Sequence, residues 1–190
     1  MNNYVIGIDE AGRGALAGPV VAAAVIFSKE QDISTFKDSK KLTHTQRENI
    51  YEHIISESLA IGIGVVHHDV IDRINILQAT FVAMKKAVLG TGLSSRIILI
   101  DGNKIIPGFD NKQKSIIKGD DKVPLISAAS IVAKVIRDRI MCGYGKVYCE
   151  YGFAQHKGYG TKLHYSNISR VGLSKIHRRS FNTSEQLSLF

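Results

Sequence analysis

Cysteine is scarce in this chain, and its scarcity limits the kinds of protein that the sequence can encode. The 190 residues include two cysteines, Cys142 and Cys149, which are separated by six residues and have no pattern of metal ligands around them. This spacing fits neither a zinc knuckle nor a redox dithiol, so we expect two reduced thiols without a function. The chain also begins without the basic, apolar and cleavage segments of a secretion signal. Together these absences predict a cytoplasmic protein.

Long apolar stretches are absent as well. The longest run, residues 15–27, contains Gly18 and Pro19 and is too short to cross a bilayer as a helix, so we expect no membrane association. Charged residues make up 22% of the chain and hydrophobic residues 44%, which is typical of soluble globular proteins. A chain of this length can bury one large core, and no repeat or low-complexity segment suggests a second domain.

Acidic residues are missing from residues 151–184, in a chain whose net charge is +8. The same stretch carries six cations: Lys157, Lys162, Arg170, Lys175, Arg178 and Arg179. Such a stretch favours binding of a polyanion, and phosphate contacts supply most non-specific affinity for nucleic acid. The alternative is a solvated basic surface. His156, His164 and His177 lack the i, i+4 spacing of a metal site, so we expect them at the surface or in contact with phosphate.

Apolar patterning predicts a sheet flanked by helices. Residues 4–10, 20–27 and 60–68 predict three consecutive strands, and residues 96–101 and 115–119 predict a fourth and a weaker fifth. Residues 45–58, 76–89 and 127–141 have the length and spacing of helices. Strands that alternate with long helices predict an α/β domain. Residues 182–190 have no periodic pattern and predict a mobile tail.

Carboxylates close two of the predicted strands. Asp9 and Glu10 end the first and Asp101 ends the fourth, while Asp120 lies just past the fifth. If strands one and four are neighbours, the four acids can converge, and oxygen ligands without Cys or His suit Mg²⁺ or Mn²⁺. Two such ions about 3.5 to 4 Å apart would support hydrolysis of a phosphodiester. Taken singly, these acids could also be solvated, with Asp101 as a turn residue and Asp120 in a loop.

A turn follows the first pair of acids. Gly12 and Gly14 flank Arg13, so the backbone can approach a ligand closely with its amides exposed. Exposed amides suit a phosphate or a hydroxyl better than an apolar group, which predicts a substrate contact at this turn.

The motifs together resemble the bacterial type 2 ribonucleases H, the ribonuclease HII family. The resemblance rests on Asp9-Glu10-Ala11-Gly12-Arg13-Gly14 and, in the family's order, on residues 16–23, 38–42, 75–80, 100–103, 118–120, 128–135, 137–139 and 156–161. It extends from Val5 to about Phe181. It implies a ribonuclease H-like fold: a five-stranded mixed sheet, three antiparallel strands followed by two parallel ones, flanked by helices and followed by a helical C-terminal segment.

The resemblance also implies an activity and its residues. The family consists of endoribonucleases that hydrolyse the RNA strand of RNA/DNA hybrids and incise duplex DNA 5′ of single ribonucleotides, using two divalent ions (Mg²⁺ or Mn²⁺) and leaving 3′-hydroxyl and 5′-phosphate ends. Its metal-binding and catalytic residues match Asp9, Glu10, Asp101 and Asp120, with Asp121 second to Asp120. Its ribonucleotide-recognition residues match Gly12, Arg13, Gly14 and Tyr159, and Lys40 is a plausible phosphate contact.

We therefore expect one catalytic domain over residues 1–181, of which about 142–181 form a basic substrate-binding segment, followed by a tail over residues 182–190. The tail ends in Gln186-Leu187-Ser188-Leu189-Phe190, which looks like the peptide with which bacterial replication and repair proteins bind the sliding clamp. Leu187, Leu189 and Phe190 could instead fold back onto the domain. We expect a monomer.

Two other functions remain open at this point. One is a clamp-tethered nucleic-acid-binding module without activity, although such a module gains nothing from carboxylates placed where phosphate must lie. The other is a different nuclease on the same fold, because a fold does not determine a function.

Overall fold

Five strands form the centre of the molecule. The computed structural model describes residues 4–28, 30–36, 43–110 and 112–181. The strands are β1 (Tyr4–Ala11), β2 (Val20–Ile26), β3 (Ala60–Val66), β4 (Ser95–Asp101) and β5 (Gln113–Ile116), in the spatial order β3-β2-β1-β4-β5. The first three strands are antiparallel neighbours, and β4 and β5 add in parallel beside β1. The predicted five-stranded mixed sheet is confirmed, including the contact between the first and fourth strands.

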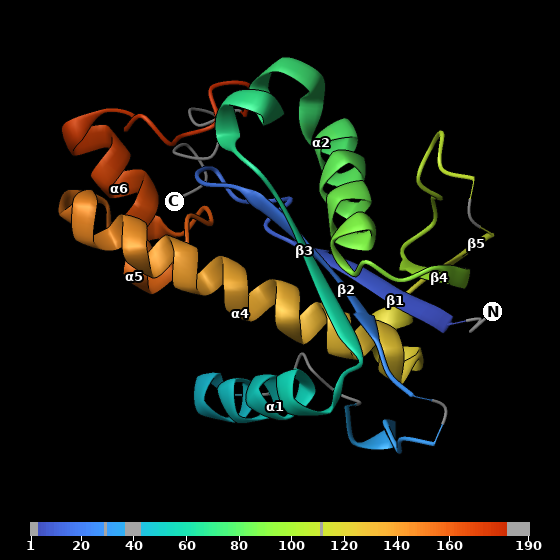
Figure 1. Cartoon of the computed structure of the whole chain (residues 1–190). Coiled ribbons are helices and arrows are strands. Elements are labelled where there is room, and N and C mark those ends of the chain that lie inside the picture. Colours follow the sequence, from blue (N-terminus) through green and yellow to red (C-terminus); the bar gives the residue numbers. More distant parts are fainter. Residues whose placement is uncertain (1–3, 29, 37–42, 111, 182–190) are drawn as a thin grey trace.

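Helices cover both faces of this sheet (Figure 1). They are α1 (His44–Glu57), α2 (His68–Gly90), α3 (Gly119–Lys122), α4 (Pro124–Val147), α5 (Phe153–His156) and α6 (Lys162–Val171), with 3-10 turns η1 (Ser34–Phe36) and η3 (Cys149–Tyr151). One core lies between the sheet and α2, and a second lies between the sheet and α1 and α4. None of the helices within the described ranges has the length and apolar character that a membrane crossing requires.

β2 is buried on both faces because its sequence, Val-Val-Ala-Ala-Ala-Val-Ile, has no polar side chain. Ala22 and Ala24 belong to the core under α2, and Ala23 and Val25 belong to the core under α4. Small residues at these positions let the helices come close to the sheet. In the adjacent β3, a Cβ on Gly64 would lie 1.9 Å from the Ala83 carbonyl oxygen of α2, so that contact requires glycine.

The helix predicted over residues 76–89 is the second half of α2. Asn75 interrupts α2 with φ 64° and ψ 165°, and its side chain accepts a hydrogen bond from the Gln78 amide at 3.1 Å. Asn75 therefore acts as an N-cap inside a longer helical segment that begins at His68. The other two predicted helices are also present: α1 is shifted by one residue, and α4 extends beyond both predicted ends.

The fifth strand differs from the prediction of residues 115–119. It covers Gln113–Ile116, and Lys118 then takes a left-handed backbone conformation with φ 55°. Gly119–Lys122 form the short helix α3 instead of continuing the strand. As a result, Asp120 lies in a helical turn that begins beside the end of β4.

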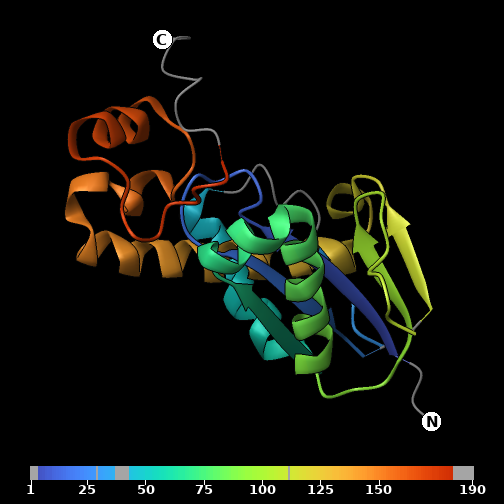
Figure 2. The same ribbon diagram turned by 90° about the horizontal axis from the view of Figure 1, so that it is seen from above.

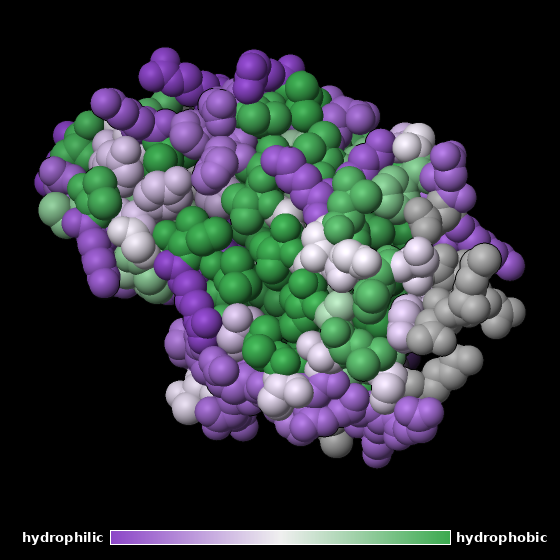
Figure 3. Space-filling model, in the orientation of Figure 1, coloured by the Kyte–Doolittle hydropathy of each residue, from purple (hydrophilic) through white to green (hydrophobic). Residues whose placement is uncertain are grey.

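The C-terminal helices gather at one end of α4. The two views in Figures 1 and 2 show α5 and α6 beyond one edge of the sheet, with β5 at the opposite side of the molecule. Helix α4 therefore connects the sheet to a separate small core formed by residues such as Met141, Tyr151 and Phe153. In Figure 3, apolar residues gather along the middle of the visible face, over edge strand β3 and its flanking helices.

Candidate active site

Two carboxylates lie next to each other at the ends of β1 and β4. Ile8 pairs with Ile100 in the parallel register, so Asp9 and Asp101, the following residues, end neighbouring strands. Asp9 is only 5% exposed. Burial raises the pKa of Asp9 well above its usual value, and the charges of Glu10 and Asp101 raise it further. This arrangement is costly without a cation to balance it.

Glu10 is held on one side only. Arg13 Nη1 lies 3.2 Å from Glu10 Oε1, while Glu10 Oε2 is buried and, among the described residues, has no hydrogen-bond partner. Burial raises the pKa of Glu10, and Arg13 opposes that effect. A buried carboxylate oxygen without a donor fits a ligand atom for a divalent cation better than a structural role.

Asp101 and Asp120 meet through the start of α3. Asp101 Oδ1 accepts hydrogen bonds from the amides of Gly119 at 2.7 Å and Asp120 at 3.3 Å. Asp120 is 6% exposed, whereas the neighbouring Asp121 is exposed. The fold thus separates two adjacent aspartates into one buried beside the strand ends and one at the surface.

The donor set fits a hard divalent ion. All four acids offer oxygen atoms, and the raised pKa values of Asp9 and Glu10 and the unpartnered Glu10 Oε2 indicate a local excess of negative charge. Within the described ranges, no three His, Cys, Asp or Glu side chains are already grouped as ligands of one ion.

The glycine-arginine-glycine turn is positioned by two buried arginines. Gly12 has φ 96°, and a Cβ there would lie 1.9 Å from Arg137 Nε. Arg178 donates to the carbonyl oxygens of Gly12 at 2.7 Å, Arg13 at 2.9 Å and Gly18 at 3.0 Å. Arg137 donates to those of Ala17, Pro19 and Lys157 at 3.0 to 3.2 Å. Because carbonyls of this loop are bound from the inside, its backbone has one defined conformation.

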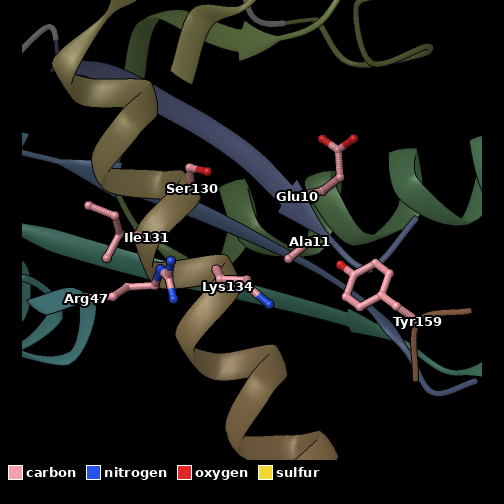
Figure 4. A pocket seen from close by; sticks show the side chains of 8 residues that line it. Glu10, Ala11, Arg47, Ser130, Ile131, Lys134 and Tyr159 are labelled. Atoms are coloured by element: carbon pink, nitrogen blue, oxygen red, sulfur yellow. The ribbon is translucent and has the colours of Figure 1, made fainter. Parts of the chain in front are cut away.

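Tyr159 stands on the other side of this turn. Its backbone forms a β-bridge with Ala15, and its half-buried ring lies 5.0 Å from the Arg137 guanidinium and 5.5 Å from Lys134 Nζ. Tyr159 and Glu10 line the same cavity of about 320 Å³, and Figure 4 shows the side chains that surround this cavity. The lining consists of Glu10, Ala11, Gly12, Arg47, Ser130, Ile131, Lys134 and Tyr159. The cavity therefore joins a predicted metal ligand, the turn and Tyr159.

Comparison with known proteins decides the family. A family model described as Ribonuclease HII matches residues 6–184. The chain belongs to the ribonuclease HII family. It is 52% identical over 178 residues, which are 94% of this chain and 69% of the relative, to ribonuclease HII of Clostridioides difficile (strain 630).

Two solved structures share its fold. Ribonuclease H2 from Pyrococcus horikoshii OT3 has a TM-score of 0.76 and 27% identity, covering 98% of this chain and 97% of that chain. A ribonuclease HII solved in complex with PCNA, from Archaeoglobus fulgidus, has a TM-score of 0.76 and 26% identity, covering 96% of each chain.

Family membership establishes the class of reaction. As a ribonuclease HII, the chain is a divalent-metal-dependent endoribonuclease that acts on RNA/DNA hybrids. It is an enzyme and not a binding module alone.

Four positions were misplaced by sequence reasoning about the basic stretch. Arg178 and the histidines His156, His164 and His177 are buried in this chain and not exposed at its surface. Burial, followed by the nearby Arg137 charge, lowers the pKa of Arg178 to about 9. The sequence of this stretch does not show which of its cations and histidines are buried against a loop and which are exposed to solvent.

Other residues of the site were not assigned a role from sequence. Ser130 of α4 forms a side-chain hydrogen bond with Asp9 that lowers the pKa of that carboxyl. Lys134 and Arg47 line the cavity, and Arg137 holds the loop. Ser130, Lys134 and Arg137 fall in blocks that resemble the family, which was the available signal. Lys40 and the tail residues Gln186, Leu187, Leu189 and Phe190 lie outside the described residues.

Proposed function

We propose that this ribonuclease HII incises duplex DNA on the 5′ side of a single embedded ribonucleotide as well as the RNA strand of longer hybrids, leaving 3′-hydroxyl and 5′-phosphate ends. The observation that carries the proposal is the shared cavity, because Glu10, the Gly12 turn and Tyr159 all line it. Groups that would recognise ribose thus lie beside a group that would hold the catalytic ions.

Asp9, Glu10, Asp101 and Asp120 would hold two Mg²⁺ or Mn²⁺ ions. When bound, such ions activate a water molecule and stabilise the leaving oxygen of an in-line displacement at phosphorus. The protein's contribution is to orient the ligands: Ser130 holds the Asp9 carboxyl, the α3 amides hold Asp101, and Arg13 fixes one oxygen of Glu10. Glu10 Oε2 remains available to a cation.

Recognition of the ribonucleotide would come from the 2′-hydroxyl, the group that separates RNA from DNA at a given nucleotide. The amides of the turn can donate to it, and the Tyr159 hydroxyl and ring can contact the sugar from the opposite side of the cavity. Arg137 and Arg178 bind the carbonyls of this loop, which favours a fixed amide geometry over one that adapts to each substrate.

The basic segment over residues 142–181 would bind the nucleic-acid backbone. With Arg178 buried, the side chains left for this task are Lys146, Lys157, Lys162, Arg170, Lys175 and Arg179, of which Lys157 is half-buried and the others are exposed. Replacing any of these cations that binds a phosphate should weaken binding and reduce its salt dependence.

The tail would bind a sliding clamp through Gln186, Leu187, Leu189 and Phe190. Support comes from the sequence of the tail and from the A. fulgidus relative, which was solved in complex with PCNA. Tethering would raise the enzyme concentration at newly replicated DNA without a new substrate contact.

The test is cleavage of three duplexes: one with a single ribonucleotide, one RNA/DNA hybrid and one all-DNA duplex, each with Mg²⁺, Mn²⁺ or EDTA. We expect metal-dependent cleavage of the first two, with end mapping that gives 3′-hydroxyl and 5′-phosphate products. Asp9→Asn and Asp120→Asn should abolish cleavage and preserve duplex binding. Asp121→Asn is the matched control and should cleave normally, since Asp121 is exposed. Metal-dependent turnover by Asp9→Asn at the wild-type rate would disprove the metal assignment.

Tyr159 is tested separately with the same substrates. Tyr159→Phe removes the hydroxyl and should reduce cleavage at a single ribonucleotide more than cleavage of the long hybrid. Tyr159→Ala also removes the ring and should cost more. Unchanged substrate preference in both variants would leave Tyr159 with a structural role only.

A further inference from the structure

The three buried histidines form a connected cluster behind Tyr159. His164 Nε2 and His177 Nε2 are 3.0 Å apart, and His156 stacks on His164 with ring centroids 4.2 Å apart. Phe153 packs edge-on against His156 and His164, and at a tilt against His177, with centroids 5.5 to 5.8 Å apart. At most 9% of any of these histidines is exposed. The cluster is therefore shielded from solvent and from the substrate.

The hydrogen-bond partners determine which ring nitrogen of His164 and of His177 carries the proton. The Ser174 amide donates to His177 Nδ1 at 2.8 Å, so His177 carries its proton on Nε2. His164 Nδ1 faces the Tyr159 carbonyl oxygen at 3.0 Å and must donate to it, so His164 Nε2 accepts from His177. The order runs in one direction, from Ser174 through His177 and His164 to the backbone of Tyr159, and both rings are neutral.

This chain of hydrogen bonds connects the two segments that flank residues 15–17, the loop that follows the glycine-arginine-glycine turn. On one side, Leu16 N donates to Gly158 O at 2.8 Å, next to the Ala15–Tyr159 bridge. On the other side, the amide of Arg178 donates to Leu16 O at 2.8 Å, and the bridge between Ala17 and His177 lies alongside. Residues 15–17, which follow the turn, are thus held between residues 158–159 and residues 177–178. The hydrogen bond between His164 and His177 connects these two segments, because His164 also donates to the Tyr159 carbonyl.

We propose that His164 and His177 are positioning residues for substrate choice: their ordered hydrogen-bond chain fixes the Tyr159 backbone relative to the Gly12–Gly14 turn. This inference rests on the proposed role of Tyr159 in recognising the ribonucleotide. In the hydrogen bonds and ring contacts of the described residues, His164 and His177 reach the cavity lining at Tyr159 alone, so they act through it and not on the reacting atoms.

The protonation state required by the chain is favoured by its surroundings. Burial, together with the charges of neighbouring histidines, lowers the pKa values of His164 and His177 to about 4. The hydrogen bond that His164 donates to the Tyr159 carbonyl opposes this effect for His164. Both rings are therefore neutral near pH 7, as required when each ring donates one hydrogen bond and accepts another.

Amide side chains test the chain because each mimics one ring nitrogen. The amide of Asn lies near the position of Nδ1 and that of Gln near Nε2. His164→Asn should keep the donor to the Tyr159 carbonyl but lose the acceptor for His177 Nε2, and His164→Gln should keep the contact with His177 but lose the donor to Tyr159. At position 177 the order is reversed: His177→Gln should keep the donor to His164, and His177→Asn should lose it. His67→Asn, at an exposed histidine, controls for general effects of the substitution.

The measurement is kcat/KM on the single-ribonucleotide duplex divided by that on the long hybrid, with the melting temperature recorded for every variant. We expect His164→Gln, His164→Asn and His177→Asn, each of which breaks one hydrogen bond between His177 and Tyr159, to lower this ratio about tenfold, the size of one net hydrogen bond. His177→Gln and His67→Asn should stay near wild type. Equal ratios for His177→Asn and His177→Gln, or wild-type ratios for both variants of His164, would overturn the proposal, as would failure of all four core variants to fold.

A second background separates this inference from the proposed function. If Tyr159→Ala and Tyr159→Phe leave the ratio unchanged, the role of Tyr159 fails first and the inference fails with it. If they change it, His164→Gln added to Tyr159→Ala should cause no further change in the ratio. An additional tenfold loss in that double variant would mean that the histidine acts elsewhere, and would overturn the inference while leaving the role of Tyr159 intact.

Discussion

The buried carboxylate of Asp9, a predicted metal ligand, destabilises the folded protein when no metal is bound. It is buried between Glu10 and Asp101, and its raised pKa means that the folded state holds a proton there more tightly than the unfolded chain does. A carboxyl with a raised pKa favours folding when protonated, and this contribution is lost as the pH rises through the folded pKa. At neutral pH without metal, Asp9 therefore lowers the free energy of unfolding.

Asp9→Asn should raise the melting temperature of the metal-free protein at pH 7, because it removes a buried charge and keeps the shape of the side chain. Mg²⁺ should raise the melting temperature of the wild type and have a smaller effect on the variant. Thermal scans with EDTA and with Mg²⁺ measure both. A lower melting temperature for Asp9→Asn in EDTA would show that the hydrogen bond with Ser130 outweighs the charge repulsion.

Substitution by alanine should have different effects at the two glycines of this turn. Gly12→Ala places a Cβ against Arg137 at φ 96°, so we expect a loss of about 1 to 3 kcal/mol in the free energy of unfolding and a loss of cleavage. A Cβ on Gly14 meets nothing within 4 Å. Gly14→Ala should therefore keep the wild-type stability and reduce cleavage only if the substrate approaches there. Urea unfolding and cleavage of the single-ribonucleotide duplex distinguish the two.

At the scale of elements, the segment after α4 folds back to hold the loop between β1 and β2. Arg178 reaches the Gly12 carbonyl across 166 positions of sequence, and Arg137 of α4 reaches Ala17 across 120. Within the described residues, no carboxylate forms a salt bridge with either arginine; carbonyl oxygens accept their hydrogen bonds instead. The C-terminal segment is thus part of the site as well as a neighbour of it.

The histidine cluster of this segment should make stability depend on pH. The pKa values of His164 and His177 fall from 6.5 in the unfolded chain to about 4 in the fold. The unfolded chain therefore binds more protons between these values, and stability is present above pH 6.5 and lost as the pH falls toward 4. We expect the melting temperature to decrease across this window.

The variant His164→Asn/His177→Gln isolates that effect, since Asp9 and Glu10 titrate with the opposite sign and are present in both proteins. The difference in unfolding free energy between wild type and variant should shrink as the pH falls from 7 to 5. His67→Asn should follow the wild type throughout. A difference that is constant over this range would contradict neutral buried histidines.

At the scale of the molecule, the proposed catalytic residues and the proposed docking peptide occupy different parts of the chain. Asp9, Glu10 and Asp101 lie at the ends of β1 and β4, Asp120 lies in α3, and the turn follows β1. The proposed clamp peptide is at the last five positions. Because the residues that line the cavity lie elsewhere in the sequence, we expect changes in the proposed clamp peptide to leave cleavage intact.

Deleting residues 186–190, or changing Leu189 and Phe190 to Ala, should abolish binding to an immobilised sliding clamp and leave cleavage of a free duplex unchanged. Ser188→Ala is the matched control and should bind the clamp normally. Retained clamp binding by the truncated protein would refute the tail as the docking element. A comparable loss of activity on a free duplex would favour packing of the tail against the domain.

Local pattern was enough to predict the sheet and its acids. Strand β2 is an apolar run that begins after Gly18-Pro19, and the apolar runs of β1 and β4 close with carboxylates. The third strand and the three long helices also have a clear pattern. Asp9, Glu10 and Asp101 stand out because a buried strand seldom ends in acids. The fifth strand was misplaced because a left-handed Lys118 ends it, and lysine has no strong preference for that conformation.

Folding separates residues that local pattern treats alike. Arg178 and Arg179 are adjacent and identical in type, yet one is buried and one is exposed; Asp120 and Asp121 divide in the same way. The family, the strand order and the set of available acids and cations could be predicted without coordinates, because they depend on residue type and spacing. The family-like spacing points to Asp120, but no local signal distinguishes Arg178 from Arg179. Which arginine turns inward depends on contacts between segments far apart in the chain, such as that of Arg178 with the Gly12 carbonyl 166 positions away, and these exist only once the chain has folded.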